Sequence, residues 1–310
     1  MKKRLTILTK PTDLIPRVKR KYGGHQAVTR SLIEGLEKIG YQEFNYGPEQ
    51  EEDIAEHVHV LAGVKTLEYA IKLKNEGKIR RLTAGPNIIV FPIEYNGIMA
   101  DGNVELCLTP SQWVANLYIE MMPDLSGRCC SWPAGVDTDV WMEHTICREE
   151  KKGNKVLVYH KEESDQFCYR VCHTLRKYGF DPIIIKYGDY VLEDYKRMLA
   201  QCEFSVVISR QESQGIFMAE AWAMDVPTLC YDPHYYRWDY NGIVYERAGD
   251  ITTCPYLTEE TGMRWDGIKE LEAVLASMDK RMKDFHPREW VMKNMSDEVC
   301  AENFLRIIGL

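Results

Sequence analysis

The sequence lacks any apolar run long enough to span a bilayer. Its first residues, MKKRLTILTKPTD, also lack the long apolar core of a secretory signal peptide, because polar residues interrupt the apolar segment early. These two absences argue against a membrane-spanning protein and against a secreted one. We therefore expect a soluble, cytoplasmic chain.

Positive charge is also scarce. With 39 Lys and Arg against 47 Asp and Glu, the formal net charge of the 310 residues is −8. Nucleic-acid binders usually need net positive charge or a dominant basic face to displace phosphate counterions, so we expect no nucleic-acid partner. The one local concentration of basic residues, RVKRKYGG at 17–24, suits either the attraction of an anionic ligand or peripheral contact with anionic lipid.

The ten cysteines include no C-x2-C pair and no matched histidine spacing. Zinc sites usually show such pairs, and several of these cysteines lie inside apolar runs such as VELCLTPS and TLCYD. We expect buried, reduced thiols.

What the sequence does contain is a regular alternation of short β-rich apolar runs with amphipathic helical stretches. RLTILTK, residues 4–10, is the first expected strand, and the helix after it carries apolar residues at helical spacing. Further strands are expected at IRRLTAG, NIIVFPI, KVLVYH and EFSVVIS. The alternation favours α/β domains with mainly parallel sheets.

Residues 133–154 break this alternation, with a charged run, two glycines and no sustained periodicity. The strand and helix pattern then restarts. We expect two Rossmann-like domains, at 1–140 and 141–290, that face each other across a cleft, and a C-terminal helix at 291–310 that packs back on the first domain. In such sheets ligands bind beyond the carboxyl ends of the strands.

One expected strand end carries unusual residues. EFSVVIS runs into RQESQ, and Gly215 then opens a helix that is apolar nearly all round. Glycine lets a ligand approach the backbone, and the free N–H groups of a first helical turn favour a phosphate. A carboxylate at Glu220, inside this helix, needs a strong partner such as ribose or sugar hydroxyls. Otherwise Glu220 would pair with a neighbouring Arg or Lys, and Glu212 would be an ordinary surface residue.

The segment ESQGIFMAEAWAMDVPTLCYD, residues 212–232, resembles the E-x7-E region of retaining GT-B glycosyltransferases, particularly those similar to family 4. Three other segments resemble the same family in the right order. They are KRKYGGHQAVTRSLIEGLEKIG for the N-terminal glycine-rich loop and helix, LTPSQWVANLY for the end of the first domain, and WPAGVDTDVW for the interdomain stretch. The resemblance implies a GT-B fold of the α/β class.

The resemblance also implies roles for single residues. Glu220 would accept hydrogen bonds from the ribose of a nucleotide-sugar donor, and Glu212 would contact hydroxyls of the transferred sugar. The glycine loop of the first domain, Gly23 and Gly24, would approach the diphosphate. The main-chain N–H groups that would hold the sugar and pyrophosphate belong to Gln214, Gly215, Ile216 and Phe217.

The family usually places an Arg and a Lys after the first strand of the second domain. Here VYHKEESDQF offers Lys161, with His160 beside it. Lys186 and Arg210, at neighbouring strand ends, are either compensating cations or surface charges. His25, directly after the glycine pair, is the candidate for the histidine that the family has in its first domain. The expected catalytic residues are Glu212, Lys161 and His25.

Asp137 and Asp139 form a D-x-D, the metal signature of a different glycosyltransferase fold, but they lie in the linker rather than at a nucleotide-binding strand. We expect no required metal or cofactor. The expected reaction is transfer of a sugar from a UDP- or GDP-linked donor to a hydroxyl of a glycan or similar acceptor, with retention of configuration. Two alternatives stay open: a sugar-nucleotide epimerase, and a catalytically silent protein of this fold that binds sugar nucleotides or carbohydrate.

Overall fold

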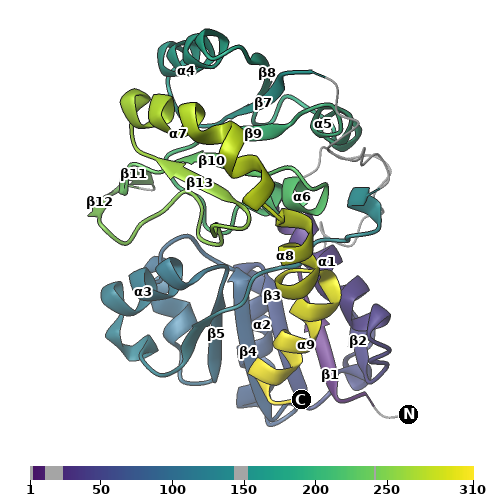
Figure 1. Ribbon diagram of the computed structural model, residues 1–310. Helices are drawn as coiled ribbons and strands as arrows, with labels where there is room; N and C mark the ends of the chain where they lie inside the picture. The colour runs from purple at the N-terminus through teal and green to yellow at the C-terminus, as the bar shows by residue number, and fades with distance from the viewer. Residues whose placement is uncertain (1–2, 11–23, 143–152, 241) are drawn as a thin grey trace. The chain divides into compact units, whose positions relative to one another are not determined.

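The computed structural model describes residues 3–10, 24–142, 153–240 and 242–310 (Figure 1). The chain forms two compact units, Met1–Gly135 with Asp297–Leu310, and Val136–Ser296. The sequence predicts domain limits after residues 140 and 290, and the limits of the two compact units fall after residues 135 and 296.

The first unit is built on a sheet of six parallel strands in the order β2-β1-β3-β4-β5-β6. The central strands β1 and β3 are buried along their whole length, which is typical of a parallel sheet covered on both faces. The strands are β1 (Leu5–Leu8), β2 (Phe44–Tyr46), β3 (His57–Ala62), β4 (Arg81–Asn87), β5 (Leu106–Thr109) and β6 (Cys129–Ser131). The helices are α1 (Gly24–Lys38), α2 (Val64–Asn75), α3 (Gln112–Met121) and α9 (Asp297–Ile308), with short 3-10 segments η3 (Glu51–Asp53), η4 (Glu94–Ala100) and η5 (Pro123–Leu125).

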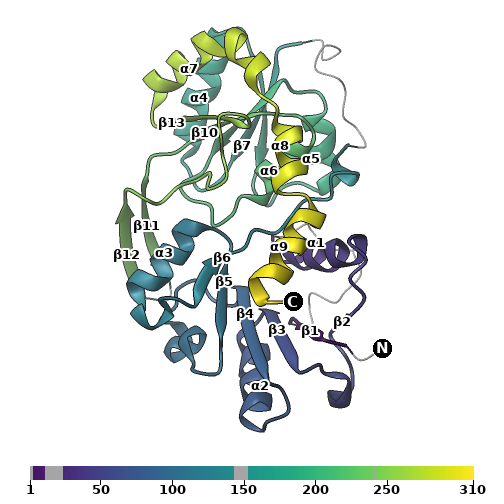
Figure 2. The same cartoon turned by 60° about the horizontal axis from the view of Figure 1, so that its bottom comes forward.

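The C-terminal helix α9 packs on α1 within this unit, and Figure 2 shows the two helices together. Arg30 of α1 donates two hydrogen bonds to Asp297, at 2.5 and 3.1 Å. Gly35 lies at the contact, where a Cβ would collide with the backbone of Asp297. Further along α9, the indole N–H of Trp132 donates to the carbonyl of Cys300 at 2.8 Å. These bonds attach the end of the chain to the first unit.

The second unit has five parallel strands in the order β13-β10-β9-β7-β8 and a separate antiparallel ribbon, β11-β12. Its core joins valines of β7 and β9 to Leu175 and Trp265. The strands are β7 (Lys155–His160), β8 (Asp181–Lys186), β9 (Phe204–Ile208), β10 (Thr228–Tyr231), β11 (Tyr235–Tyr240), β12 (Ile243–Ala248) and β13 (Gly262–Trp265). The helical segments are η6 (Val140–Met142), α4 (Asp165–Lys177), α5 (Leu192–Leu199), α6 (Ile216–Ala223), α7 (Ile268–Arg281), η8 (Met282–Asp284) and α8 (Pro287–Asn294). The α/β class with two Rossmann-like halves is thus confirmed.

The strand expected at NIIVFPI is wrong, because residues 88–93 form bends and turns after β4 ends at Asn87. Pro92 has no N–H to offer a sheet, and the carboxylate of Glu94 accepts the N–H groups of Val90 and Phe91 at 2.9 and 2.6 Å. The local bonds to Glu94 replace the ladder that an extended run would form. Apolar composition alone does not distinguish these two outcomes.

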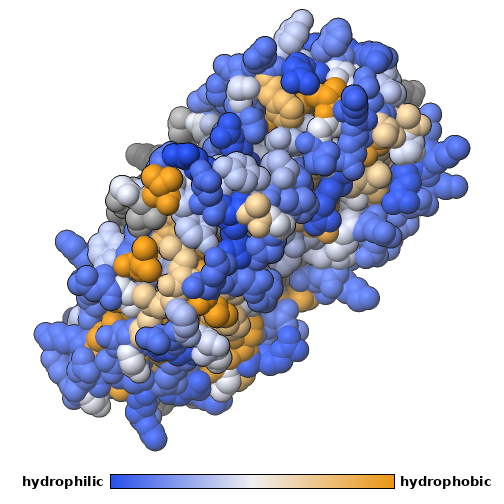
Figure 3. Space-filling model, turned by 90° about the vertical axis from the view of Figure 1, so that its left-hand side faces the viewer, coloured by the Kyte–Doolittle hydropathy of each residue, from blue (hydrophilic) through white to orange (hydrophobic). Residues whose placement is uncertain are grey.

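The surface shown in Figure 3 is mostly hydrophilic, with apolar residues in small groups between the polar ones. Within the described part of the chain, no helix has both the length and the apolar character needed to cross a membrane.

The strand order of the second unit distinguishes one position at the edge of its sheet. The chain leaves β7 toward β8 on one side, and β9 lies on the other side of β7, so the winding reverses between β7 and β9. Open α/β sheets bind ligands beyond the carboxyl ends of the strands at such a reversal. Lys161 directly follows β7, and the turn 209–212 directly follows β9.

Candidate functional site

Lys161 and Glu212 meet where the winding of the second sheet reverses. The N–H of Lys161 donates to the carbonyl of Ile208 at 2.8 Å and so extends the β7–β9 pairing by one residue. The Lys161 Nζ then lies 2.9 Å from Oε1 of Glu212. Only 14% of the Lys161 side chain and 10% of the Glu212 side chain are exposed. The alternative interpretation of Glu212 as an ordinary surface residue does not agree with this burial.

Three further side chains surround this ion pair. Ser209 Oγ donates to Oε1 of Glu212 at 3.2 Å. Glu162 Oε1 lies 3.9 Å from the Lys161 Nζ, which also lies 4.9 Å from the centre of the Tyr187 ring. The ammonium is thus held by two carboxylates and the face of an aromatic ring, an arrangement that favours the cation.

The two members of the pair affect each other's protonation. Burial raises the pKa of Glu212, and the Lys161 ammonium offsets part of that rise. Burial also acts to lower the pKa of Lys161, but the Glu212 and Glu162 carboxylates together outweigh burial, so that the pKa of Lys161 is raised. Each charge thus counteracts the effect that burial has on the pKa of the other group.

Gly215 begins helix α6, as the sequence predicts. Its φ of 76° and ψ of 50° lie in the left-handed region, and a Cβ there would collide with Met218. Gly215, the N-cap residue, has no side chain with which to cap the first turn of α6. The backbone therefore turns sharply behind Glu212 and presents the start of a helix to whatever binds there.

Glu220 lies in the middle of α6 and is 1% exposed. Burial raises the pKa of Tyr190 to about 12, against the effect of its bond with Tyr159, and the Glu220 carboxylate adds to the rise. The Glu220 carboxylate therefore lies near Tyr190. Tyr159 in turn stacks on Phe217 at 3.9 Å between ring centres, and Phe217 belongs to the first turn of α6. Tyrosines of β7 and of the loop after β8 thus pack beside this helix.

The other expected cations are about half exposed. Arg210 Nε lies 3.1 Å from Glu163, with 48% of the arginine side chain but only 14% of the glutamate side chain exposed. Lys186 lies 3.3 Å from Asp165, and both of these side chains are more than half exposed. The Lys186 pair is therefore a surface ion pair, a type that contributes little to stability.

The remaining expected residues are divided between the two units. Gln214 is buried beside Gly215, and Ile216 is the first residue of α6. Gly24 and His25 belong to the first unit, where they form the start of α1, and His25 Nδ1 lies 3.3 Å from the Lys10 Nζ. Gly23 lies outside the described residues.

The D-x-D has a structural role in the backbone. Oδ1 of Asp137 accepts the N–H groups of Asp139 and Val140, both at 3.1 Å, and so caps η6. These bonds use the Asp137 carboxylate to begin a turn.

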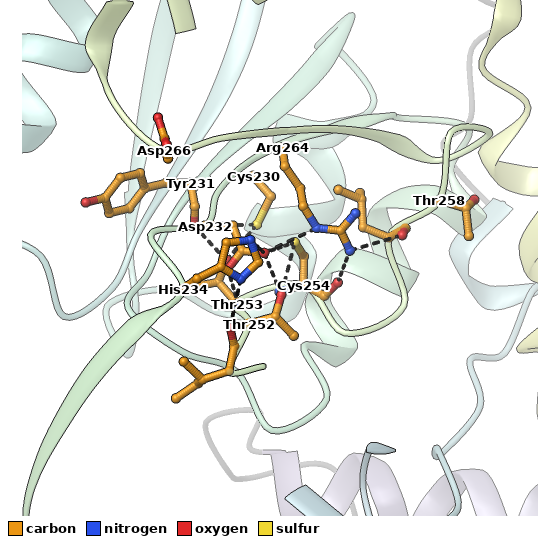
Figure 4. A network of polar contacts seen from close by, with 12 residues as sticks. Cys230, Tyr231, Asp232, His234, Thr252, Thr253, Cys254, Thr258, Arg264 and Asp266 are labelled. Carbon is orange, nitrogen blue, oxygen red and sulfur yellow. Dashed lines mark hydrogen bonds and ion pairs between the residues drawn. The ribbon is translucent and has the colours of Figure 1, made fainter. Parts of the chain in front are cut away.

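Sequence reasoning missed the residues on the far side of Glu212. The N–H of Glu212 donates to the carbonyl of Thr252 at 3.3 Å, and Thr252 belongs to a group of polar contacts around Asp232 (Figure 4). The signal that could have found Asp232 is its position, because it directly follows β10 and so lies at the same edge of the sheet as Lys161 and Glu212.

The chain has two Rossmann-like units, and the candidate site of the second lies where the strand order reverses. Two such units are the architecture of the GT-B fold. No protein-family model matches the chain, and no curated protein does. Among solved structures, sucrose-phosphate synthase from Thermosynechococcus elongatus is similar with a TM-score of 0.63 at 12% identity, over 98% of both chains.

Two lipopolysaccharide enzymes are also similar. The outer core galactosyltransferase WaaB matches with a TM-score of 0.62 at 12% identity, over 99% of both chains. WaaG, a glycosyltransferase involved in lipopolysaccharide biosynthesis, matches with a TM-score of 0.53 at 12% identity, over 98% of this chain and 99% of that one. Identities this low show the fold alone, and the expected GT-B fold is confirmed.

Proposed function

We propose that the protein is a glycosyltransferase that moves a sugar from a nucleotide diphosphate sugar, UDP- or GDP-linked, to a hydroxyl of an acceptor such as a glycan. The observation that carries the proposal is the meeting of Lys161 with Glu212 at the reversal of the second sheet. The GT-B fold is consistent with it, and the similar structures include enzymes whose names describe sugar transfer.

Lys161 would stabilise the leaving group. Breaking the bond between the sugar and the diphosphate develops negative charge on the diphosphate, and a cation already in place stabilises that charge more in the transition state than in the ground state. The ammonium is now bonded to Glu212. A donor phosphate must therefore share the Lys161 cation with the Glu212 carboxylate.

The two glutamates would hold different parts of the donor. Glu220 is buried within α6, where it would accept hydrogen bonds from the ribose. Glu212 would accept bonds from hydroxyls of the transferred sugar, and the N–H groups of the first turn of α6, after Gly215, would hold the diphosphate. Retention of configuration is proposed from the resemblance to retaining enzymes. Since no nucleophilic side chain is assigned for a covalent intermediate, the acceptor would attack the same face of the sugar that the diphosphate leaves, with the donor phosphate accepting the proton of the acceptor hydroxyl.

A second candidate function is binding without catalysis. The pairing of Lys161 with Glu212 and of Arg210 with Glu163 favours it, because carboxylates already compensate these cations. A silent protein of this fold would bind a sugar nucleotide and release it unchanged.

Donor consumption separates these two functions. UDP- and GDP-sugars are first screened by the rise that they cause in the unfolding temperature. Release of UDP or GDP is then followed with candidate acceptors, and the anomeric configuration of the product is read by NMR. Nucleotide release with a retained anomeric centre supports the proposal, binding without turnover supports the silent protein, and the absence of nucleotide binding refutes both.

A further inference from the structure

A buried carboxylate, Asp232, lies at the carboxyl end of β10. It directly follows that strand and is 2% exposed. An ionised carboxylate in such a place is costly unless it is well hydrogen-bonded, so its partners indicate what it holds. Figure 4 shows Thr252, Cys254 and Arg264 around it.

Most of the partners come from one short loop. Oδ1 of Asp232 accepts the N–H of Thr253 at 3.0 Å, and Oδ2 accepts the hydroxyl of Thr252 at 2.6 Å. The thiol of Cys254 also donates to Oδ2, at 3.4 Å. Three consecutive residues are therefore bonded to a single carboxylate.

Arg264 of β13 holds the same loop from the other side. Its Nε donates to Oδ2 of Asp232 at 3.2 Å, and its Nη2 donates to the carbonyl of Cys254 at 3.2 Å. Thr253 adds a bond from its hydroxyl to the carbonyl of Tyr231 at 2.6 Å. The loop is thus fixed to the ends of both β10 and β13.

This loop reaches the candidate site through one backbone bond. The carbonyl of Thr252 accepts the N–H of Glu212 at 3.3 Å, and the Glu212 carboxylate holds the Lys161 ammonium. We infer that Asp232 is a positioning residue, whose carboxylate fixes the Thr252 carbonyl and thereby the position of Glu212. The inference rests on the proposed role of Glu212 in sugar transfer.

A carboxylate is the group that this arrangement needs. Oδ2 accepts bonds from Thr252, Cys254 and Arg264, and an amide nitrogen in its place would face these donors with hydrogens of its own. Asp232→Asn therefore keeps the shape of the side chain but can accept bonds at only one of the two oxygen positions, so that it loses either the bonds to Oδ2 or the bond to Oδ1. Asp266→Asn is the matched control, because Asp266 is an exposed aspartate that directly follows the neighbouring strand β13.

The experiment combines hydrogen exchange with kinetics on the full chain. In Asp232→Asn we expect faster amide exchange in peptides that contain residues 252–254 and in those that contain Glu212, with no change in β7. With a UDP- or GDP-sugar, we expect kcat to fall about tenfold to a hundredfold, the size of effect that a small displacement of a reacting group causes. The donor KM should change less than about threefold, because Glu220 and α6 are untouched. Asp266→Asn should leave the exchange and kcat unchanged.

Each outcome decides the inference. Unchanged exchange at Glu212 overturns it, and so does faster exchange with an unchanged kcat. If Asp232→Asn does not fold, Thr252→Val removes one of the bonds to Asp232, together with the bond from the Cys254 N–H to the Thr252 hydroxyl, and should give the same pattern with a smaller fall in kcat, about threefold to tenfold. If the wild-type chain consumes no donor, the proposed function fails, while the exchange data still decide whether Asp232 holds Glu212.

Discussion

The ammonium of Lys161 and Oε1 of Glu212 lie 2.9 Å apart, and both side chains are more than four-fifths buried. The parallel pairing of β7 with β9 brings them together, since each residue follows the end of its strand. A cation and a carboxylate that have lost most of their water depend on each other for compensation. A diphosphate that binds Lys161 must therefore supply negative charge to the ammonium, as the Glu212 carboxylate does.

Removal of one member of this pair is expected to destabilise the second unit. Lys161→Met leaves Glu212 buried without its main counter-charge and should lower the free energy of unfolding by about 3 kcal/mol. The double variant Lys161→Met with Glu212→Gln should regain most of this loss, because neither charge then remains. Urea unfolding gives both values.

An exposed ion pair of the same unit provides the control. Lys186 and Asp165 are 3.3 Å apart but more than half exposed, so Lys186→Met should cost less than about 1 kcal/mol. Equal costs for Lys161→Met and Lys186→Met would contradict the assignment of the Lys161 pair as the buried one.

The two glutamates should differ in what they contribute to the reaction. Glu220→Gln replaces a buried carboxylate that would accept the ribose hydroxyls, and the donor Kd should rise about tenfold to a hundredfold. Glu212→Gln should mainly lower kcat, since its bonds would be to the transferred sugar. Calorimetric titration with the donor, beside initial rates of nucleotide release, separates the two effects. Wild-type values in both variants are the result that this assignment does not survive.

Much of the fold follows from periodicity. The alternation of β-rich runs with amphipathic helices predicts two parallel sheets, and the parallel pairing of the strands confirms it. The sequence also predicts Gly215 at the start of a helix and Glu220 inside it, because the glycine lies between the end of a strand and an apolar helix. These features are local, so a single sequence carries them.

The contacts that build the site are not local. Lys161 and Glu212 are 51 residues apart, and only the strand order shows that they pair. Asp232 and Arg264 likewise meet because β10 and β13 are neighbours, which no spacing in the sequence indicates. The family resemblance implies separate roles for Lys161 and Glu212, whereas the structure shows a hydrogen bond between them.

Gly215→Ala should destabilise the second unit. The substitution places a Cβ at a φ of 76° and against the terminal methyl group of the buried Met218, which must shift, so we expect a loss of about 2 kcal/mol of unfolding free energy. Gly179→Ala is the control, because Gly179 has a φ of 86° but nothing within 4 Å of an added Cβ. It should cost about 1 kcal/mol, from the backbone alone. Thermal or urea unfolding of the two variants tests whether space matters beyond backbone conformation.

Metal removal is expected to leave activity intact. Asp137 is used as a backbone cap for Asp139 and Val140, and Lys161 would supply the positive charge for the leaving group. Excess EDTA should therefore change the initial rate of nucleotide release by less than about twofold, which corresponds to a change of less than about 0.5 kcal/mol in the barrier. Asp137→Ala should lower stability by about 1 kcal/mol through the lost cap. Loss of activity in EDTA, with recovery on added Mg²⁺ or Mn²⁺, would show that a metal is required.

Two buried histidines of β3 should make the first unit sensitive to acid. Burial lowers the pKa of His57 to about 4, helped by Arg81, and burial lowers the pKa of His59 to about 3. Nε2 of His59 donates to the carbonyl of Gly85 at 2.9 Å, so that in the neutral ring Nδ1 accepts the hydroxyl of Thr83, also at 2.9 Å. The His59 ring packs against Phe304 of α9. The folded state therefore keeps both imidazoles neutral.

The direction of the effect follows from proton binding. The unfolded chain binds these protons near the ordinary histidine pKa of about 6.5, and the folded chain binds them only near pH 4 and below. Stability that is complete above about pH 6.5 is lost as the pH falls toward about 4. At about pH 5 each histidine should cost roughly 2 kcal/mol relative to about pH 7.5. Urea unfolding at these two pH values measures the loss, and His57→Gln should remove about half of the histidine share. A pH dependence as large in His57→Gln as in the wild type would mean that His57 does not cause it.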